Sequence, residues 1–197
     1  ADIAPVIGFA HLAICHLETP IVPVGQALST YPVYGVPVEV TNAIASAGYD
    51  RCSTASNHTF DRGVAGIDRT VAALESVGVQ QSGMARTPAE AIPQVVSMNG
   101  AAVTHLSYTY GFNGAYVPSG QQWRSPLINV DRIIADGRVA RQRGAELVVL
   151  SLHWGVEYDR QPSAEQRRVA EAVTASGAVD LILGHHAHVL QPVERIN

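Results

Sequence analysis

Four short groups of polar side chains in this sequence combine residue types that can bind metal ions or move protons. They are His16 with Glu18, Asn57 with His58, His153 with Glu157, and His185 with His186 and His188. Imidazoles, carboxylates and amide oxygens suit divalent ions of Mn, Fe, Zn or Mg. Two such ions about 3.5 to 4 Å apart can clamp the attacking and leaving oxygens of a displacement at phosphorus. The residue types therefore favour metal-dependent hydrolysis.

Each group lies at the end of an apolar run that has the length of a strand. The predicted strands cover residues 11–15, 49–55, 145–152 and 179–184, and the predicted helices cover 37–48, 61–78, 125–143 and 162–177. This alternation is typical of βα units on a mostly parallel, buried sheet and indicates the α/β class. Ligands of such sheets bind at the carboxyl ends of the strands. We therefore expect the four groups to converge on one edge of the sheet.

Polar residues mark where the helices begin. Asp61 is the expected N-cap of the second predicted helix, and Ser125 with Pro126 is the expected start of the third. Ser163 and Gln166 have the spacing of a capping box at the start of the fourth. These positions give testable boundaries for three helices.

Two further spacings predict local backbone conformation. The pair Asn99 and Gly100 predicts a tight turn between adjacent strands within residues 92–110. His186 and His188 are two positions apart, which would point both rings to the same side if the backbone there is extended.

The segment over residues 111–124 is expected to be a long loop, because Gly, Asn, Ser and Pro are frequent in it. Its aromatic residues could cover the site and contact substrate, or they could only pin a surface loop. Arg51, Arg62 and Arg160 are expected near the same edge, where they could meet an anionic substrate, although solvated arginines are commoner. No substrate-binding residue is assigned.

Composition narrows the class of protein. A chain of 197 residues with a formal charge of −4 fits one globular domain and gives no sign of a nucleic-acid partner. No apolar run approaches the roughly 18 residues of a spanning helix, so no membrane segment is expected in this chain. All 13 basic residues are arginines, which excludes a catalytic lysine. Cys15 and Cys52 lie in predicted strands without a CxxC partner, and two separate buried thiols are expected in preference to a disulfide or a metal role.

Each candidate taken alone also has a structural interpretation. Asp61 could be a helix cap and nothing more, and His153 could simply form a hydrogen bond at a strand end. A carboxylate such as Glu18 or Glu157 could be solvated in a loop. His11 and His105 fall within strand-like runs and are expected to be structural. The joint placement of the groups is what favours a site.

Three stretches resemble a known family over nearly the whole chain. They are "ADIAPVIGFAHLAICHLETP", "GYDRCSTASNHTFDRGVAGIDRTVAALESVGV" and "VVLSLHWGVEYDRQPSAEQRRVAEAVTASGAVDLILGHHAHVLQPVE". They resemble the CapA family of capsule synthesis and poly-γ-glutamate biosynthesis proteins. That family is similar to the calcineurin-like metallophosphoesterases, so the resemblance implies a four-layer α/β sandwich with a dinuclear metal centre.

The resemblance implies roles for the residues around the second group. "SNH" resembles the superfamily motif G-N-H-[DE], which would make Asn57 a metal ligand and His58 the residue that stabilises or protonates at the scissile bond. Asp61, three residues on, would orient His58 and favour its charged form.

The same resemblance assigns the remaining ligands. His153 of "HWG" would bind metal, and the H-x-H ligands would be His186 and His188, with His185 preceding them. "HLE" resembles the family motif N-L-E, in which Glu18 would be the metal-side carboxylate. His16 stands where the family usually has Asn, and an imidazole can also coordinate or form a hydrogen bond.

Two parts of the family pattern are absent from this sequence. An opening strand with a Gly-Asp ligand should precede it, and a closing strand with a further Asn-containing motif should follow it. We therefore expect residues 1–197 to be a single CapA-like domain that belongs to a longer chain and is incomplete at both ends.

The resulting functional hypothesis is a metal-dependent hydrolase of the metallophosphoesterase type, acting on an anionic polymer or a phosphoester in capsule, poly-γ-glutamate or cell-envelope metabolism. The resemblance also implies other capsule-synthesis proteins as partners and the extracytoplasmic face of a bacterial cell envelope as location. The alternative is a non-catalytic scaffold or polymer-handling subunit that keeps the ligands but not the turnover. A third reading is a plain α/β binding domain with incidental histidines.

Overall fold

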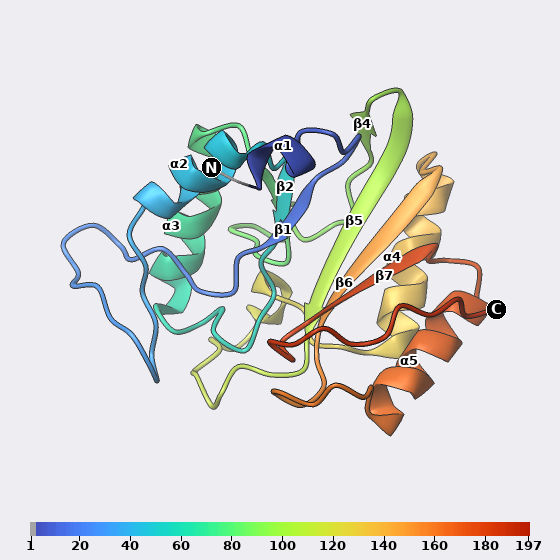
Figure 1. The fold of residues 1–197 in the computed structure, drawn as a ribbon. Helices are drawn as coiled ribbons and strands as arrows, with labels where there is room; N and C mark the ends of the chain where they lie inside the picture. Colours follow the sequence, from blue (N-terminus) through green and yellow to red (C-terminus); the bar gives the residue numbers. More distant parts are fainter. Residues whose placement is uncertain (1–2) are drawn as a thin grey trace. The chain divides into compact units, whose positions relative to one another are not determined.

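The computed structural model describes residues 3–197, which form two compact units. Of the described residues, the first unit contains 3–91 and 111–126, and the second contains 92–110 and 127–197. Both units combine strands with helices, which confirms the predicted α/β class (Figure 1). The strands belong to two sheets, which fits the four-layer sandwich that the resemblance implies and not the single sheet that the alternation alone predicts.

The first unit is built on a three-stranded parallel sheet of order β1-β2-β3. Its strands are β1 (Ile14–His16), β2 (Arg51–Ser53) and β3 (Gln80–Ser82). Its helices are α1 (Ala4–Ile7), α2 (Glu39–Ala47), α3 (Gly63–Ser76) and the short 3₁₀ helix η1 (Gln122–Arg124). A buried cluster of Leu17, Cys52, Leu74 and Val79 joins the sheet to α3, with Val40 and Ile44 of α2 packed against it. Helices α2 and α3 therefore pack against the short strands.

Cys15 and Cys52 lie directly opposite each other on β1 and β2, with their Cα atoms 4.4 Å apart, and a disulfide joins them. The expectation of two separate thiols is wrong for this reason. The thiols belong to neighbouring register positions of adjacent strands, and strand pairing between distant segments has no local signal in the sequence.

The second unit is built on a four-stranded sheet of order β4-β5-β6-β7. Its strands are β4 (Val96–Met98), β5 (Ala101–Thr109), β6 (Leu147–His153) and β7 (Leu181–His185). β4 and β5 are antiparallel, and the other neighbours are parallel. Asn99 and Gly100 join β4 to β5 with φ angles of 48° and 87°, so the predicted tight turn is confirmed.

Two helices, α4 (Val130–Gln142) and α5 (Ala164–Ala175), lie side by side along this sheet (Figure 1). Alternate residues of β6, namely Val148, Leu150 and Leu152, pack into one buried cluster with the apolar side chains of both helices. The intervening residues, which include His153, consequently face the opposite side of the sheet. Period-two alternation thus separates the apolar core from the polar candidates.

Two of the predicted helix starts are wrong. Residues 127 and 128 run beside the end of β5, where the Ile128 N–H donates to the Thr109 carbonyl at 2.9 Å, and α4 begins only after Asn129, whose side chain accepts from the Arg132 N–H. α3 begins after Arg62 and has no side-chain cap, because the Asp61 carboxylate is bound elsewhere. Tertiary hydrogen bonds moved both boundaries.

The start of α5 is as predicted. Ser163 accepts from the Gln166 N–H, and the Gln166 side chain accepts from the Ser163 N–H, so the capping box is complete. None of the helices described here is long and apolar enough to cross a membrane.

Candidate metal and hydrolase site

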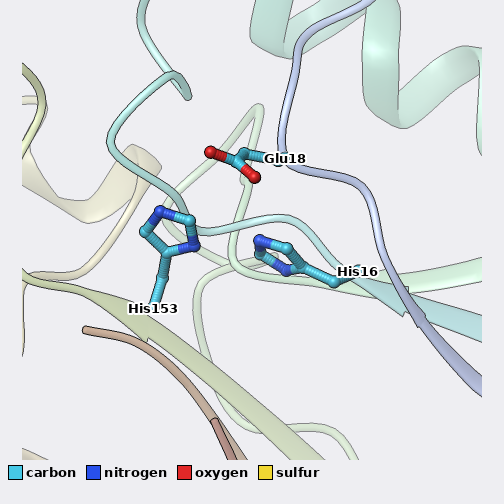
Figure 2. A group of neighbouring side chains, drawn as sticks. All are labelled: His16, Glu18 and His153. Atoms are coloured by element: carbon cyan, nitrogen blue, oxygen red, sulfur yellow. The ribbon is translucent and has the colours of Figure 1, made fainter. Parts of the chain in front are cut away.

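His16 and Glu18 form a pair at the end of β1 in the first unit (Figure 2). His16 Nδ1 lies 2.7 Å from the Ser53 hydroxyl on the neighbouring strand. A ring nitrogen of His16 and a carboxylate oxygen of Glu18 lie within 4.8 Å of each other. Because Nδ1 is held by Ser53, Nε2 is the ring atom of His16 that could coordinate a metal. The pair therefore offers one imidazole and one carboxylate.

The loop after β2 carries the second group in a fully buried turn. The Ser56 hydroxyl donates to the Glu18 carbonyl at 2.5 Å and accepts from the His58 N–H at 3.1 Å. The Asn57 amide lies 3.5 Å from Asn113 of the loop over residues 111–126. This turn ties the first two predicted groups together within one unit, as expected for the carboxyl ends of neighbouring strands.

His58 and Asp61 form a buried hydrogen-bonded pair. His58 Nδ1 lies 2.7 Å from Asp61 Oδ2, and the two side chains are 10% and 5% exposed. The same carboxylate oxygen accepts from the Tyr34 N–H at 2.7 Å. A carboxylate at Nδ1 keeps the proton on that nitrogen and turns Nε2 toward a reacting group, which is the arrangement general acid or base catalysis needs. Asp61 thus has the predicted orienting contact and not the alternative role of a helix cap.

The third and fourth groups meet within the second unit. His153 ends β6 (labelled in Figure 2) and is paired in register with His185, which ends β7. The ring centroids of His153 and His186 are 4.7 Å apart, and those of His186 and His188 are 6.2 Å apart. Tyr110 packs on this group, 4.9 Å from the ring of His186. We call His153, His186 and His188 the histidine cluster.

The backbone of the histidine cluster is not extended at His186 and His188. His186 and His188 have φ angles of 88° and 53°, in the left-handed region. Their rings still come together, because a ring nitrogen of each lies within 4.8 Å of the other. The condition on which that expectation depends, an extended backbone, is therefore not met, and the two rings approach each other from a left-handed backbone.

His185 and Glu157, the two remaining candidates of these groups, lie in different surroundings. Burial lowers the pKa of His185 to about 4, so its ring is neutral near pH 7, the form that binds metals. Glu157 is exposed on a turn beyond β6 and belongs to no group of potential metal ligands found among the described residues. Of the two, His185 is the one placed beside the histidine cluster.

The three arginines expected near the site have different surroundings. Arg51 opens β2 and so lies at its amino end, where it bonds Gln80 at 3.3 Å, and burial lowers the pKa of Arg51 to about 10. Its predicted place at the carboxyl edge is therefore wrong. Arg62 binds main-chain carbonyls of residues 27 and 34, and Arg160 is exposed.

The expected loop over residues 111–124 is largely irregular, as predicted, apart from η1. Phe112 packs edge-on against Phe60 at 4.8 Å, and Asn113 with Gly114 forms a turn with φ angles of 50° and 76°. The Asn-Gly pair is a signal that could have located this turn from the sequence. Tyr34, which contacts His58, carries no comparable local signal.

A comparison with protein families places the chain. The model of the family described as "Bacterial capsule synthesis protein PGA_cap" matches residues 1–197. The chain belongs to this family. The predicted resemblance is thereby confirmed, and the mixed α/β content with two sheets fits the metallophosphoesterase-like fold expected for it.

Curated relatives of this capsule family come from three bacteria. The "Capsule biosynthesis protein CapA" of Bacillus anthracis is 32% identical over 158 residues, covering 78% of this chain and 38% of the relative. The "PGA biosynthesis protein CapA" of Bacillus subtilis is 30% identical over 165 residues, covering 81% and 42%. A "probable polyglutamine synthesis accessory protein" of Mycobacterium tuberculosis is 24% identical over 195 residues, covering 93% and 51%. The chain thus spans from two fifths to half of the length of these relatives.

Proposed function

We propose that this PGA_cap family member is a metal-dependent hydrolase of the metallophosphoesterase type. The observation that carries the proposal is the histidine cluster, in which three imidazoles from the ends of β6 and β7 gather. We also propose that residues 1–197 act as a single CapA-like domain.

The donor chemistry fits a divalent metal. The proposed ligands are Glu18, Asn57, His153, His186 and His188, with His16 and His185 as further candidates. Oxygen and imidazole donors suit Mn, Fe, Zn or Mg, and both cysteines are joined in a disulfide, so no thiolate competes. When bound, such a metal would polarise a phosphoryl oxygen and lower the pKa of a water molecule.

The chain's own residues would handle the proton. His58, held at Nδ1 by Asp61, would donate from Nε2 to the oxygen of the departing group. Asp61 would hold the Nδ1–H, so that the doubly protonated ring donates from Nε2 and the neutral ring left behind keeps its proton on Nδ1. The buried turn around Asn57 and His58 would keep water away from the proton donor.

The names of the relatives support a polymer substrate. They refer to capsule, PGA and polyglutamine synthesis. We therefore propose a poly-γ-glutamate or related capsule polymer, or a phosphoester formed during its synthesis, as substrate, and other capsule-synthesis proteins as partners.

A second candidate is a metal-binding, polymer-handling subunit without turnover. The word "accessory" in the name of the mycobacterial relative favours it. Both candidates require the metal, and they differ only in whether an ester is hydrolysed.

The test is hydrolysis of phosphomonoesters and phosphodiesters by the intact protein with added Mn²⁺. We expect His186→Ala to lose turnover. The control is His11→Ala, which changes an exposed histidine outside the histidine cluster and outside the His16–Glu18 pair, and it should retain turnover. Stoichiometric metal without turnover on any ester would favour the polymer-handling candidate. A protein that takes up no metal at excess would contradict both.

A further inference from the structure

One loop of the first unit is anchored beside His58. Its ends meet where the Val22 N–H donates to the Val36 carbonyl at 3.0 Å and the Val36 N–H donates to the Pro20 carbonyl at 3.0 Å. Within it, Ser29 and Gly35 pair through two main-chain hydrogen bonds of 3.1 Å. A loop of this length with joined ends is an Ω-loop, and we call residues 22–36 the Ω-loop.

Asp61 and Arg62 grip the Ω-loop at Tyr34. The Tyr34 N–H donates to Asp61 Oδ2 at 2.7 Å, and its carbonyl accepts from Arg62 Nε at 3.1 Å. Arg62 also bonds the Ala27 carbonyl at 3.2 Å and the Ser29 hydroxyl. Consecutive residues therefore hold both polar groups of the Tyr34 main chain.

Gly35 permits this close approach. A Cβ atom there would collide with the Arg62 guanidinium and would lie 2.5 Å from Val22 Cγ1. The Ω-loop is consequently seated against Arg62 with no room for a larger residue, and the position of Tyr34 is fixed.

The ring of Tyr34 meets the ring of His58 edge to face. Their centroids are 4.6 Å apart and their planes are inclined by 86°. His58 therefore has two restraints, the hydrogen bond from Nδ1 to Asp61 and the packing of Tyr34 on the ring. Edge-to-face pairs of this kind are favourable beyond their buried area. The hydrogen bond restrains one atom of the imidazole, and the Tyr34 ring restrains its plane.

We infer that Tyr34 is a positioning residue for His58, holding the imidazole so that Nε2 faces the leaving group. The inference rests on the proposed hydrolase function for its effect on rate. The geometry of the His58 ring, however, can be measured without any turnover.

The experiment compares Tyr34→Ala with Tyr34→Phe, which keeps the ring, in the intact protein. Aryl phosphodiesters of 4-nitrophenol and of phenol serve as substrates, since the poorer phenol leaving group depends more on proton donation. Relative to wild type, we expect Tyr34→Ala to lose about 10-fold in kcat on the phenyl ester and less than about 3-fold on the nitrophenyl ester, because a misplaced acid loses part of its roughly 100-fold contribution. Tyr34→Phe should match wild type on both. Equal losses on both esters, or none, would overturn the inference.

Nuclear magnetic resonance of the His58 ring nitrogens gives the second readout. Wild type and Tyr34→Phe should show one tautomer with the proton on Nδ1, and Tyr34→Ala should show a mixture, because the ring leaves Asp61 part of the time. A single Nδ1–H tautomer in Tyr34→Ala would overturn the inference. Wild-type protein that hydrolyses neither ester would contradict the proposed function, and the tautomer would still decide the role of Tyr34.

Discussion

His186 and His188 bring their rings together through a backbone conformation that residues with a Cβ atom usually avoid. Their φ angles of 88° and 53° lie in the left-handed region, which costs on the order of 1 to 3 kcal/mol for a residue other than glycine. Such strain is common at binding sites, where the surrounding structure compensates for it. The short stretch after β7 is thus shaped for the rings it presents.

Two substitutions of His188 distinguish the contribution of its ring from the cost of its backbone conformation. We expect His188→Gly and His188→Ala to weaken metal binding alike, because both remove the imidazole. His188→Gly should be more stable than His188→Ala by about 1 kcal/mol, since glycine adopts the left-handed conformation without steric cost. Urea unfolding with a chelator present measures the difference.

Equal stability of these two variants would mean that position 188 is not left-handed. Unchanged metal affinity in both would remove His188 from the ligands.

At the scale of single residues, the sequence predicts contacts between near neighbours better than contacts between residues far apart in the chain. The contact of His58 with Asp61, which the family resemblance implied, joins residues only three positions apart. The contact of Tyr34 with the same pair joins residues far apart in the chain, so no local pattern reveals it. The left-handed backbone after β7 was missed because most histidines have negative φ and no glycine marks the two positions.

At the scale of secondary-structure elements, helix ends show the same difference between local and long-range interactions. The capping box of Ser163 and Gln166 involves only neighbouring residues and was predicted correctly. Ser125 and Pro126 have the composition of a helix start, but the chain just after them hydrogen bonds to the end of β5 and stays extended. Local propensity decides an element boundary only where no tertiary hydrogen bond competes for the backbone.

Gly155 links the end of β6 to this capping box. Its φ is 90°, and a Cβ atom there would lie 2.7 Å from the Gln166 side-chain oxygen, which accepts from Ser163. Gly177 has a similar φ of 68° with open space around it. We expect Gly177→Ala to cost about 1 kcal/mol of unfolding free energy, and Gly155→Ala to cost about 1 to 2 kcal/mol more, because Gln166 must give up its hydrogen bonds.

Urea unfolding of the two variants checks this expectation. Equal losses would show that Gln166 moves aside freely and that the capping box does not depend on Gly155.

At the scale of the whole molecule, the sequence predicted the alternation of strands and helices but not their division into two sheets. Apolar periodicity marks a strand as buried and leaves its partners undefined. The placement of the polar groups at the carboxyl ends of strands was nevertheless correct for β1, β2, β6 and β7. That rule needs only the end of each apolar run and the direction of the chain, which the order of the residues defines.

The disulfide between Cys15 and Cys52 closes a segment with a sequence separation of 37 residues. A cross-link of this span restricts the unfolded chain, and we expect its reduction to lower the free energy of unfolding by about 3 to 4 kcal/mol. Denaturation with and without a reductant measures the loss. The control is a protein with both Cys15→Ala and Cys52→Ala, which should not respond to reductant. A wild type equally stable in both conditions would show that the bond contributes nothing.

The central claim is that the histidine cluster holds a metal, with the rings of His153 and His186 only 4.7 Å apart. Calorimetric titration of the intact protein with Mn²⁺ tests it through His153→Ala, His186→Ala and the double variant. We predict stoichiometric binding by wild type, a loss of about 10-fold or more in affinity for each single variant, and a double variant whose loss is clearly not the sum of the two. Wild-type protein that takes up no Mn²⁺, or additive losses in the double variant, would contradict the claim.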